Sequence, residues 1–323
     1  MLKIAYIIPS LIKTGPNIVV KYLVDEMVKF GHCCYVYYLD ESRGLELACG
    51  SERLSFSKQI SWNHFSIVHS HGIRPNLYVL SHRPFGGKTK CVTTFHSYFF
   101  EELRCDYGWL KGSIYSFLFL MSAARHHRIV ALSKDAQMYY SRFFSSEKVD
   151  YVYDGLDFKE MGLDVIKKKQ HMTSKPGNVC VVGTYCVPSP LKGLDVLSEA
   201  VKRLGNDYKL LVLYGKEDVY KDLDRFDVFV ISSYTEGFCL ALLEAAAAGK
   251  NIVCSDIPGM REKYSDDEVT YFPAGQVTEL AKAIKEAQHS NKGGKAHMKA
   301  MTFSAHRMGM GYDRVYKLLS KKT

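Results

Sequence analysis

The sequence lacks several features that would place it in other classes of protein. Its 323 residues contain no uninterrupted apolar run of about 18, so we expect no membrane-spanning helix. The first residues, MLKIAYIIPS, are too short and too strand-like for a signal peptide and predict a buried strand. The nine cysteines include no C-x2-C pair and lie mostly in apolar runs, which favours reduced thiols in a cytoplasmic protein.

The sequence also lacks a recognisable metal site. His69 and His71, in VHSHG, have the spacing that places two side chains on one face of a strand, yet no third and fourth ligand follow. We expect structural or substrate-contacting histidines there rather than a metal pair. Internal repeats and low-complexity segments are absent as well.

Charge of one sign is in modest excess, with a net charge of +9. Residues 1–170 hold 22 Lys and Arg against 16 Asp and Glu, and residues 171–323 hold 21 against 18. No nucleic-acid-binding motif accompanies the excess, so we expect no nucleic-acid partner. An anionic membrane surface, a phosphorylated substrate, or a basic surface without a special partner explains it equally well.

The chain contains alternating strand-like and helical patterns, which predict α/β units with parallel sheets. We expect an N-terminal domain over residues 1–168 and a C-terminal domain over 174–303, with a polar linker at 167–177 (KKKQHMTSKPG). The predicted strands are, in order, KIAYIIP, CYVYYL, IVHSH, KCVTTFH, IVALS, KVDYVY, VCVVGTY, KLLVLYG, DVFVIS, NIVCSD and VTYFPA. Two similar domains suit a ligand bound in a cleft between them.

The stretch from Asp227 to Gly259 is the most informative part of the sequence. An apolar strand leads into a polar turn, an almost wholly apolar helix and a second strand. Glu236 stands at the turn and Glu244 inside the helix, although glutamate is rarely buried without a partner. Glu244 therefore indicates either a ligand or pairing with a lysine or the backbone. Gly237 at the helix start would let an anionic ligand approach the free N–H groups.

This stretch resembles a known family of enzymes. The spacing of Glu236 and Glu244 is similar to the E-x7-E motif of family 4 retaining glycosyltransferases, and SSYTEGF, LLEAAAAGK and IVCSDIPGMRE fit around it. The resemblance extends from Met1 to about Tyr316. It implies the GT-B fold: two Rossmann-like parallel-sheet α/β domains facing a cleft, with the last helix (304–323) crossing back to the N-terminal domain.

The resemblance implies site residues in the first half of the chain. Gly15, in KTGPNIVV after the first strand, is similar to the glycine loop that faces donor phosphate and acceptor, where the family usually has two glycines. His96 matches the family histidine near the donor sugar, and would bond a sugar hydroxyl or the departing oxygen. The last helix would complete this acceptor-binding domain.

The donor-binding residues implied by the resemblance lie in the second half. Lys192 matches the lysine that contacts the diphosphate, and Gly183 precedes the usual position of an arginine, where this chain has Thr184. Glu236 would lie beside the donor sugar. The remaining implied donor contacts are the Gly237 and Phe238 amides and the Glu244 carboxylate, which would accept from the ribose hydroxyls.

The missing arginine places the full donor site in question, and Arg261 or another lysine is the candidate replacement. No D-x-D motif suited to Mg²⁺ or Mn²⁺ stands beside the expected diphosphate, so we expect no metal and no cofactor. The donor substrate would be a UDP or GDP sugar. The chain is also shorter than the family between Leu204 and Asp227, which indicates a missing or compressed strand–helix unit.

Residues 109–121 (WLKGSIYSFLFLM), followed by ARHHR, allow two interpretations. They are either an interfacial patch that meets a lipid-linked acceptor, or a core helix of the N-terminal domain with a basic end. We favour the core helix for most of this surface, and a peripheral position on the cytoplasmic membrane face stays open.

Together these features predict a metal-independent retaining glycosyltransferase. It would move a sugar from a nucleotide diphosphate sugar to a glycan hydroxyl, with a lipid-linked oligosaccharide for capsule, O-antigen or exopolysaccharide as the expected acceptor. His96, Glu236 and Lys192 are the predicted catalytic residues. Two alternatives remain: a nucleotide-sugar epimerase of the same architecture, or an inactive nucleotide-sugar-binding subunit.

Overall fold

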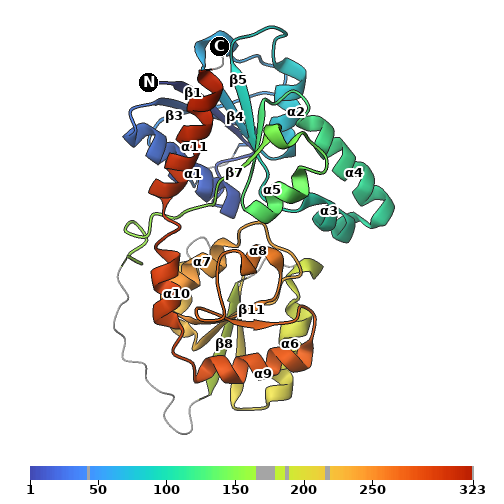
Figure 1. The fold of residues 1–323 in the computed structure, drawn as a ribbon, viewed down its shortest axis with the longest axis vertical. Helices are drawn as coiled ribbons and strands as arrows, with labels where there is room; N and C mark the ends of the chain where they lie inside the picture. The colour runs from blue at the N-terminus through green and yellow to red at the C-terminus, as the bar shows by residue number, and fades with distance from the viewer. Residues whose placement is uncertain (42–43, 165–178, 186–188, 215–218, 322–323) are drawn as a thin grey trace. The chain divides into compact units, whose positions relative to one another are not determined.

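The computed structural model describes residues 1–41, 44–164, 179–185, 189–214 and 219–321, which form two compact units (Figure 1). Unit 1 comprises Met1–Leu156 and Ser304–Thr323, and unit 2 comprises Asp157–Phe303. Each unit has one parallel sheet with helices packed on it. The predicted α/β class with two parallel-sheet domains is therefore confirmed, whereas the predicted linker at 167–177 lies outside the described residues.

Unit 1 is built on a seven-stranded parallel sheet in the order β3-β2-β1-β4-β5-β6-β7. The strands are β1 (Lys3–Ile8), β2 (Cys33–Tyr38), β3 (Gly50–Arg53), β4 (Ile67–His71), β5 (Lys90–Thr94), β6 (Arg128–Ala131) and β7 (Val149–Tyr151). The central strands β1 and β4 are almost wholly buried, as apolar strands covered on both faces must be.

The helices of unit 1 follow the strands in alternation. They are α1 (Gly15–Lys29), α2 (Ile73–His82), α3 (Phe99–Tyr107), α4 (Trp109–Ser122), α5 (Lys134–Tyr140) and α11 (Ala305–Ser320), with short 3₁₀ turns η1 (Trp62–His64) and η2 (Ser146–Lys148). The last of them, α11, packs beside α1, and its Tyr316 hydroxyl lies 2.6 Å from Nδ1 of His69 in β4. The predicted return of the last helix to the N-terminal domain is confirmed.

Helix α4 is not the core helix that we expected. Its large apolar side chains are mostly exposed, with Trp109 at 72% and Leu110 at 65%, whereas Gly112 and Ser116 are buried. The sequence shows an apolar segment, but an apolar segment does not reveal which of its faces is covered. Within the described residues, no helix combines the length and the apolar character needed to cross a membrane.

Unit 2 has a five-stranded parallel sheet in the order β12-β11-β10-β8-β9. The strands are β8 (Cys180–Tyr185), β9 (Tyr208–Leu213), β10 (Val228–Ile231), β11 (Asn251–Ser255) and β12 (Thr270–Phe272). The helices are η3 (Pro190–Lys192), α6 (Leu194–Leu204), η4 (Val219–Arg225), α7 (Leu240–Ala247), α8 (Pro258–Arg261), α9 (Val277–Gln288) and α10 (Gly293–Ala300). Alternate residues of the inner strands pack under α6 and α9, while α7 and α10 contact each other.

The stretch between α6 and β10 is compact. After β9, the described residues contain only η4 before the chain enters β10, and β9 is an edge strand of the sheet. In the middle of the sheet of unit 2, β10 lies between β11 and β8. The turn that follows β10 therefore leaves the sheet next to the end of β8, which is where parallel sheets commonly bind ligands.

Candidate functional site

Lys192 and Glu236 lie in two different loops of unit 2 and meet as an ion pair. Lys192 Nζ is 2.7 Å from Glu236 Oε1, and the hydroxyl of Ser233 donates to the same oxygen at 2.6 Å. The two charged side chains are 31% and 11% exposed, respectively. Among the described residues, Glu236 Oε2 has no hydrogen-bond partner, so it can accept a ligand hydroxyl beside the lysine cation.

The backbone holds these two loops together. Gly193, directly after Lys192, has φ 59°, and a Cβ on it would lie 2.3 Å from the carbonyl oxygen of Ser232. The Ser232 hydroxyl donates to the Lys192 carbonyl at 2.8 Å, and the Tyr234 amide donates to the Leu191 carbonyl at 2.8 Å. Only glycine fits at position 193. The close approach of Gly193 to the Ser232 carbonyl fixes the backbone position of the neighbouring Lys192.

The N-terminus of α7 follows the turn and has an unusual backbone. Cys239, which precedes the first helical residue, adopts φ 66°, the only positive φ among the described non-glycine residues. Gly237 and Phe238 are buried, and within the described part of the chain the Gly237 amide has no hydrogen-bond partner. A strained residue and an unpaired amide at a helix N-terminus form a favourable position for an anion.

A lysine that the sequence did not single out supports this turn. Lys263, 2% exposed, donates a short hydrogen bond to the carbonyl of Phe238, and its Nζ lies 4.4 Å from the centroid of the Phe238 ring. A lysine is rarely buried so completely, because its charge must be desolvated. Lys263 therefore holds Phe238 in place through its carbonyl and its ring, and it places a buried positive charge next to the turn.

The other predicted donor residues of unit 2 are placed as follows. Gly183 lies inside β8, and a Cβ on it would be 2.1 Å from the Phe226 ring, so this glycine makes room for Phe226. Thr184 follows in the same strand and is buried. Glu244 is half-buried in α7. The structure brings Lys192 and Glu236 into contact and assigns Gly183 a packing role.

Arg261, the candidate replacement for the missing arginine, is engaged elsewhere. Its guanidinium contacts Asp256 and Asp266, each at 2.7 Å, and lies 3.7 Å from the centroid of the Tyr271 ring. The hydrogen bonds to Asp256 and Asp266 raise the pKa of Arg261. Two carboxylates thus compensate its charge, and Lys192 is the cation that stands beside Glu236.

In unit 1, His96 forms a pair with a second histidine. Nε2 of His96 lies 3.0 Å from Nδ1 of His71, which ends β4. Burial lowers the pKa of His96 to about 4 and the pKa of His71 well below the ordinary value, so both rings are neutral at pH 7. Two neutral imidazoles that share one proton fix each other's tautomers.

His71 also shows an unsatisfied polar atom. Its ring is 2% exposed, and its Nε2 has no hydrogen-bond partner in the described structure. The neighbouring His69, with ring centroids 4.1 Å apart, is fully satisfied by Tyr316 and by Thr94 at 2.9 Å. The sequence indicated a shared face for His69 and His71, but the pairing of His71, at the end of β4, with His96, which follows β5, was missed.

Gly15 begins α1, as expected for a turn that follows the first strand. The side chain of the N-cap residue, Thr14, makes no capping hydrogen bond. Asn17 instead holds the preceding loop, donating to the carbonyls of Ser10 at 3.0 Å and Ile12 at 2.8 Å. The side-chain amide of Asn17 therefore holds the loop that leads into the Gly15 turn.

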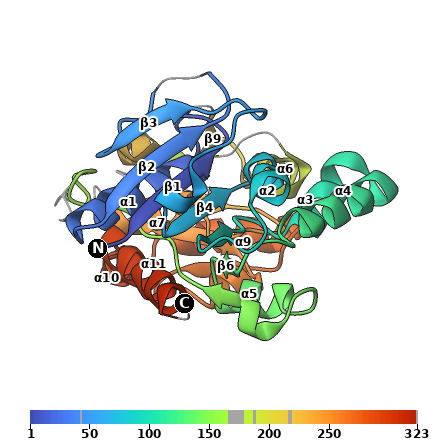
Figure 2. The ribbon, with the colours of Figure 1, turned by 90° about the horizontal axis from the view of Figure 1, so that it is seen from above.

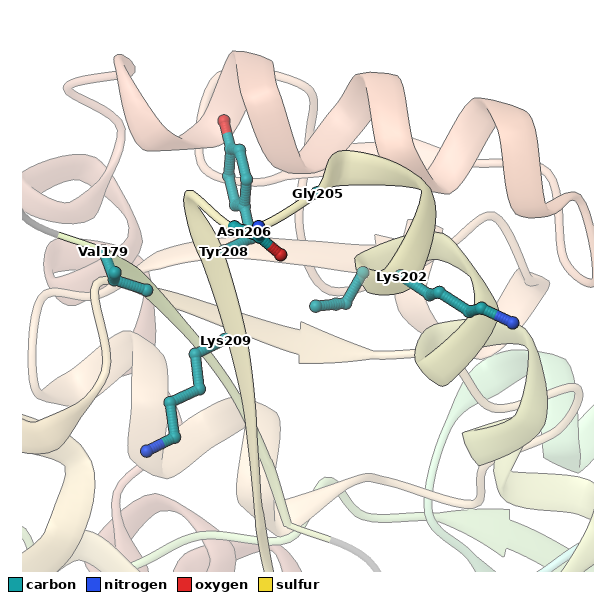
Figure 3. Close-up of a pocket in the computed structure, with 7 residues that line it drawn as sticks. Val179, Lys202, Gly205, Asn206, Tyr208 and Lys209 are labelled. Carbon is teal, nitrogen blue, oxygen red and sulfur yellow. The ribbon is translucent and has the colours of Figure 1, made fainter.

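A pocket of about 450 Å³ in unit 2 lies away from these residues (Figure 3). It is lined at the beginning of β9 and the end of α6 by Val179, Val201, Lys202, Gly205, Asn206, Tyr208 and Lys209. The ammonium groups of Lys202 and Lys209 point in different directions in Figure 3, so they do not converge on one ligand. The candidate site is at the opposite end of β8.

The residues described by the structure include no cluster of three or more His, Cys, Asp or Glu side chains suited to a metal ion. Their eight cysteines are all free. Burial raises the pKa of Cys239 to about 12, so the thiol beside the turn is not an anionic nucleophile near pH 7. The polar groups that the structure places at this turn are the Lys192 ammonium, the Glu236 carboxylate and the Gly237 amide.

Comparison with known proteins gives relatives that match the whole chain or part of it. The chain is 27% identical over 361 aligned residues to the O-antigen biosynthesis glycosyltransferase WclY of Escherichia coli, covering 99% of each chain. It is 26% identical over 222 residues, 60% of this chain and 59% of the other, to a Campylobacter jejuni enzyme. That enzyme is named N-acetylgalactosamine-N,N'-diacetylbacillosaminyl-diphospho-undecaprenol 4-alpha-N-acetylgalactosaminyltransferase.

Solved structures share the fold. Sucrose-phosphate synthase from Thermosynechococcus elongatus matches with a TM-score of 0.79 at 14% identity, covering 100% of both chains. HepE from Anabaena in complex with UDP and glucose matches with a TM-score of 0.76 at 14% identity, covering 98% of this chain and 100% of the other. At these identities the likeness establishes the fold alone, which is GT-B.

Two family models match consecutive parts of the chain. The model described as Glycosyltransferase Family 4 matches residues 14–160, and the model described as Glycosyl transferases group 1 matches residues 164–302. Together the two matches cover the chain except residues 1–13, 161–163 and 303–323. The chain therefore belongs to the family 4 and group 1 glycosyltransferases and is a glycosyltransferase of the GT-B fold.

Proposed function

We propose that this enzyme moves a sugar from a nucleotide diphosphate sugar to a hydroxyl of a lipid-linked oligosaccharide during synthesis of a surface polysaccharide. The full-length match to an O-antigen biosynthesis glycosyltransferase supports the pathway. Two Campylobacter jejuni relatives named for diphospho-undecaprenol substrates support a lipid-linked acceptor. In this proposal residues 174–303 bind the donor, and residues 1–168 with the last helix bind the acceptor.

The contact between Lys192 and Glu236 is the observation that carries the donor assignment. The Lys192 ammonium would bind the donor diphosphate and stabilise the charge that develops on it as the sugar leaves. The Gly237 and Phe238 amides at the start of α7 would face the diphosphate or the sugar. Glu236 would accept a sugar hydroxyl through Oε2, and Glu244 would accept the ribose hydroxyls.

The donor nucleotide is proposed to be UDP or GDP, with no metal and no cofactor. HepE structures contain UDP and UDP-glucose, which supports a uridine donor by likeness of fold. Thr184 is buried where the family's usual arginine would follow Gly183, so Lys192 carries the diphosphate contact with helix α7. Lys263 adds a fixed positive charge beneath the same turn.

We propose a retaining reaction in which the leaving group assists the acceptor. The bond between the anomeric carbon and the diphosphate oxygen breaks, and the acceptor oxygen bonds to that carbon on the same face. The acceptor proton passes to the leaving diphosphate, so no protein nucleophile is required. His96, neutral and fixed by His71, would hydrogen-bond a sugar hydroxyl or the departing oxygen, and the Gly15 turn would admit phosphate or acceptor.

The assay that tests this function follows free nucleoside diphosphate with and without a lipid-linked acceptor. A transferase releases nucleoside diphosphate only when acceptor is present, and Glu236→Gln, which keeps the shape of the side chain, reduces this release. A change in the sugar without acceptor would show an epimerase instead. Donor binding with no turnover under any condition would show an inactive binding subunit. The anomeric configuration of the product, read by NMR against that of the donor, tests retention.

The proposed place of action is the cytoplasmic face of the membrane, where nucleotide sugars and lipid-linked acceptors meet. Free, largely buried thiols suit a reducing compartment. Cell fractionation with and without high salt tests this placement. Recovery of the protein only from an extracytoplasmic fraction would contradict it.

A further inference from the structure

The Glu236 carboxylate makes its hydrogen bonds to the described residues through one oxygen. Lys192 Nζ lies 2.7 Å from Oε1, and the Ser233 hydroxyl donates to the same oxygen at 2.6 Å. The other oxygen, Oε2, accepts from none of the residues that the structure describes. One oxygen of Glu236 therefore contacts a cation, while the other can accept a hydrogen bond from a ligand hydroxyl.

Lys192 and Glu236 belong to loops that follow two neighbouring strands of unit 2. Strands β8 and β10 pair directly. The 3₁₀ turn η3, which contains Lys192, follows β8 in the chain, and the turn that contains Glu236 follows β10. The helices after these loops have different neighbours, since α6 packs beside α9 and α7 packs beside α10 (Figures 1 and 2). An anion bound at this end of the two strands would therefore lie close to both the ammonium and the carboxylate.

The other two cations considered for this turn have partners of their own. Lys263 donates to a backbone carbonyl of the turn, and Arg261 contacts two other carboxylates. Within the described residues, Lys192 is the cation that contacts Glu236. Both side chains are partly buried, so solvent screens their charges less than at the surface. An anion that binds Lys192 must therefore share this cation with Glu236, and it meets a repulsion that grows with its own charge.

The substrate and the product of the proposed reaction carry different charges at the β-phosphate. In a nucleotide sugar this phosphate is a diester with a single negative charge. In the free nucleoside diphosphate it is a terminal phosphate, whose second pKa of about 6 leaves it mostly doubly charged near pH 7. The free nucleoside diphosphate also lacks the sugar hydroxyl that Glu236 Oε2 would accept. The Glu236 carboxylate should therefore disfavour the product more strongly than the substrate.

We propose that Glu236 weakens the binding of the free nucleoside diphosphate relative to the nucleotide sugar and thereby promotes release of the product. Its charge is the cause, because the carboxylate competes with the terminal phosphate for the Lys192 ammonium and repels that phosphate. The nucleotide sugar meets the same carboxylate with one negative charge fewer and with a hydroxyl to donate. The inference rests on the proposed donor site and adds to it a residue that discriminates substrate from product.

The substitution Glu236→Gln removes this charge but keeps the shape of the side chain and an oxygen that can accept from Lys192. Calorimetric titration of the full-length protein measures the affinity for UDP and GDP, and then for UDP-glucose or GDP-mannose, according to which nucleotide binds. We expect the nucleoside diphosphate to bind Glu236→Gln at least about fivefold more tightly than the wild type. The nucleotide sugar should gain less or lose affinity, because its hydroxyl loses a charged acceptor.

Three further variants separate the charge of Glu236 from its shape and from the net charge of unit 2. Glu236→Ala removes the charge together with the side chain and should also bind the nucleoside diphosphate more tightly than the wild type. Glu236→Asp keeps a carboxylate, so its gain should be smaller than that of Glu236→Gln. Glu279→Gln removes a carboxylate that lies 2.7 Å from Lys282 in an exposed ion pair of α9, and it should leave every affinity unchanged. The melting temperature of each variant without ligand reports whether it is folded.

Three results would overturn the inference. If the nucleoside diphosphate bound Glu236→Gln no more tightly than the wild type but bound Lys192→Met more weakly, the donor site would stand and Glu236 would not oppose the diphosphate. An equal gain in Glu279→Gln would assign the effect to the net charge of unit 2. A wild type that bound neither UDP nor GDP, or an unchanged affinity in Lys192→Met, would contradict the proposed donor site itself and the inference with it.

Discussion

Lys192 Nζ lies 2.7 Å from Glu236 Oε1, although the two residues belong to loops that are 44 positions apart in the chain. The pair is partly buried, so it is screened less than a surface ion pair. Glu236 holds the lysine in place before a ligand arrives, and a diphosphate would then compete with Glu236 for the same ammonium. In the proposed donor site, Glu236 would therefore hold Lys192 in position before the diphosphate binds.

The close approach at Gly193 can be tested against a second left-handed glycine. Gly193→Ala should destabilise unit 2 by more than about 2 kcal/mol, because backbone strain adds to a clash with the Ser232 carbonyl. Gly162→Ala, at φ 66° in a helix-cap turn of the same unit and with no atom within 4 Å of its Cβ, should cost only the strain of about 1–2 kcal/mol. Thermal unfolding of both variants is the measurement. Equal losses would show that the clash with Ser232 is relieved without cost.

Lys263 should matter through its support of the turn at Phe238. Lys263→Met removes the donor to the Phe238 carbonyl in a buried position, and we expect a loss of about 1–3 kcal/mol in stability together with weaker nucleotide binding. Lys295→Met removes an exposed ion pair with Asp267 and should leave both quantities nearly unchanged. Denaturant unfolding and nucleotide titration of the two variants provide the comparison. If Lys263→Met bound nucleotide with wild-type affinity, Lys263 would not support nucleotide binding through the turn.

The docking of α11 on unit 1 depends on a buried hydroxyl. Tyr316→Phe leaves Nδ1 of His69 without its partner at 2.6 Å, and we expect a loss of about 1–3 kcal/mol. Tyr115→Phe makes the same chemical change at a 40% exposed position in α4 and should be nearly neutral. If the two substitutions have the same effect on unfolding, the Tyr316 hydroxyl does not hold the helix.

Stability should decrease as the pH falls from about 6.5 towards 4. Burial lowers the pKa of His96 to about 4 and of His126 to about 3, whereas an unfolded histidine titrates near 6.5. Below pH 6.5 these histidines therefore bind protons in the unfolded chain but stay neutral in the folded chain. Each of them lowers the free energy of unfolding by about 2 kcal/mol at pH 5. A melting temperature that is constant between pH 7 and 5 would contradict buried neutral histidines, and His96→Asn should flatten the slope.

Most of the fold could be predicted because its strands are buried apolar runs. Strand Lys3–Ile8 is apolar and buried after its first residue. Strand Val228–Ile231 is apolar and buried throughout. The strand Gly50–Arg53 was missed, since GSER is a mostly exposed edge segment without apolar residues. Helix α4 was misjudged for a related reason: apolar content predicts that a face avoids water, but it does not say whether protein or lipid covers it.

The site was only partly accessible from the sequence. Lys192, Glu236 and Gly237 follow a family pattern with local spacing, so the order of residues along the chain is enough to predict them. Lys263 and His71 act through contacts with Phe238 and His96 across distant segments, and no local spacing encodes such contacts. The contacts of Arg261 with Asp256 and Asp266 were likewise not encoded in the pattern that suggested it as a replacement for the missing arginine, and its role stays a prediction.

Calorimetric titration of the wild type and of Lys192→Met with UDP and GDP tests whether Lys192 binds the donor diphosphate. We expect that one of the two nucleotides binds and that its affinity falls at least about tenfold in Lys192→Met, because a charge-assisted contact to the diphosphate is lost. Lys209→Met, at an exposed lysine of the remote pocket, should bind as the wild type does. Equal affinity in Lys192→Met and wild type, or no binding of either nucleotide, would contradict a donor site built on Lys192 and Glu236.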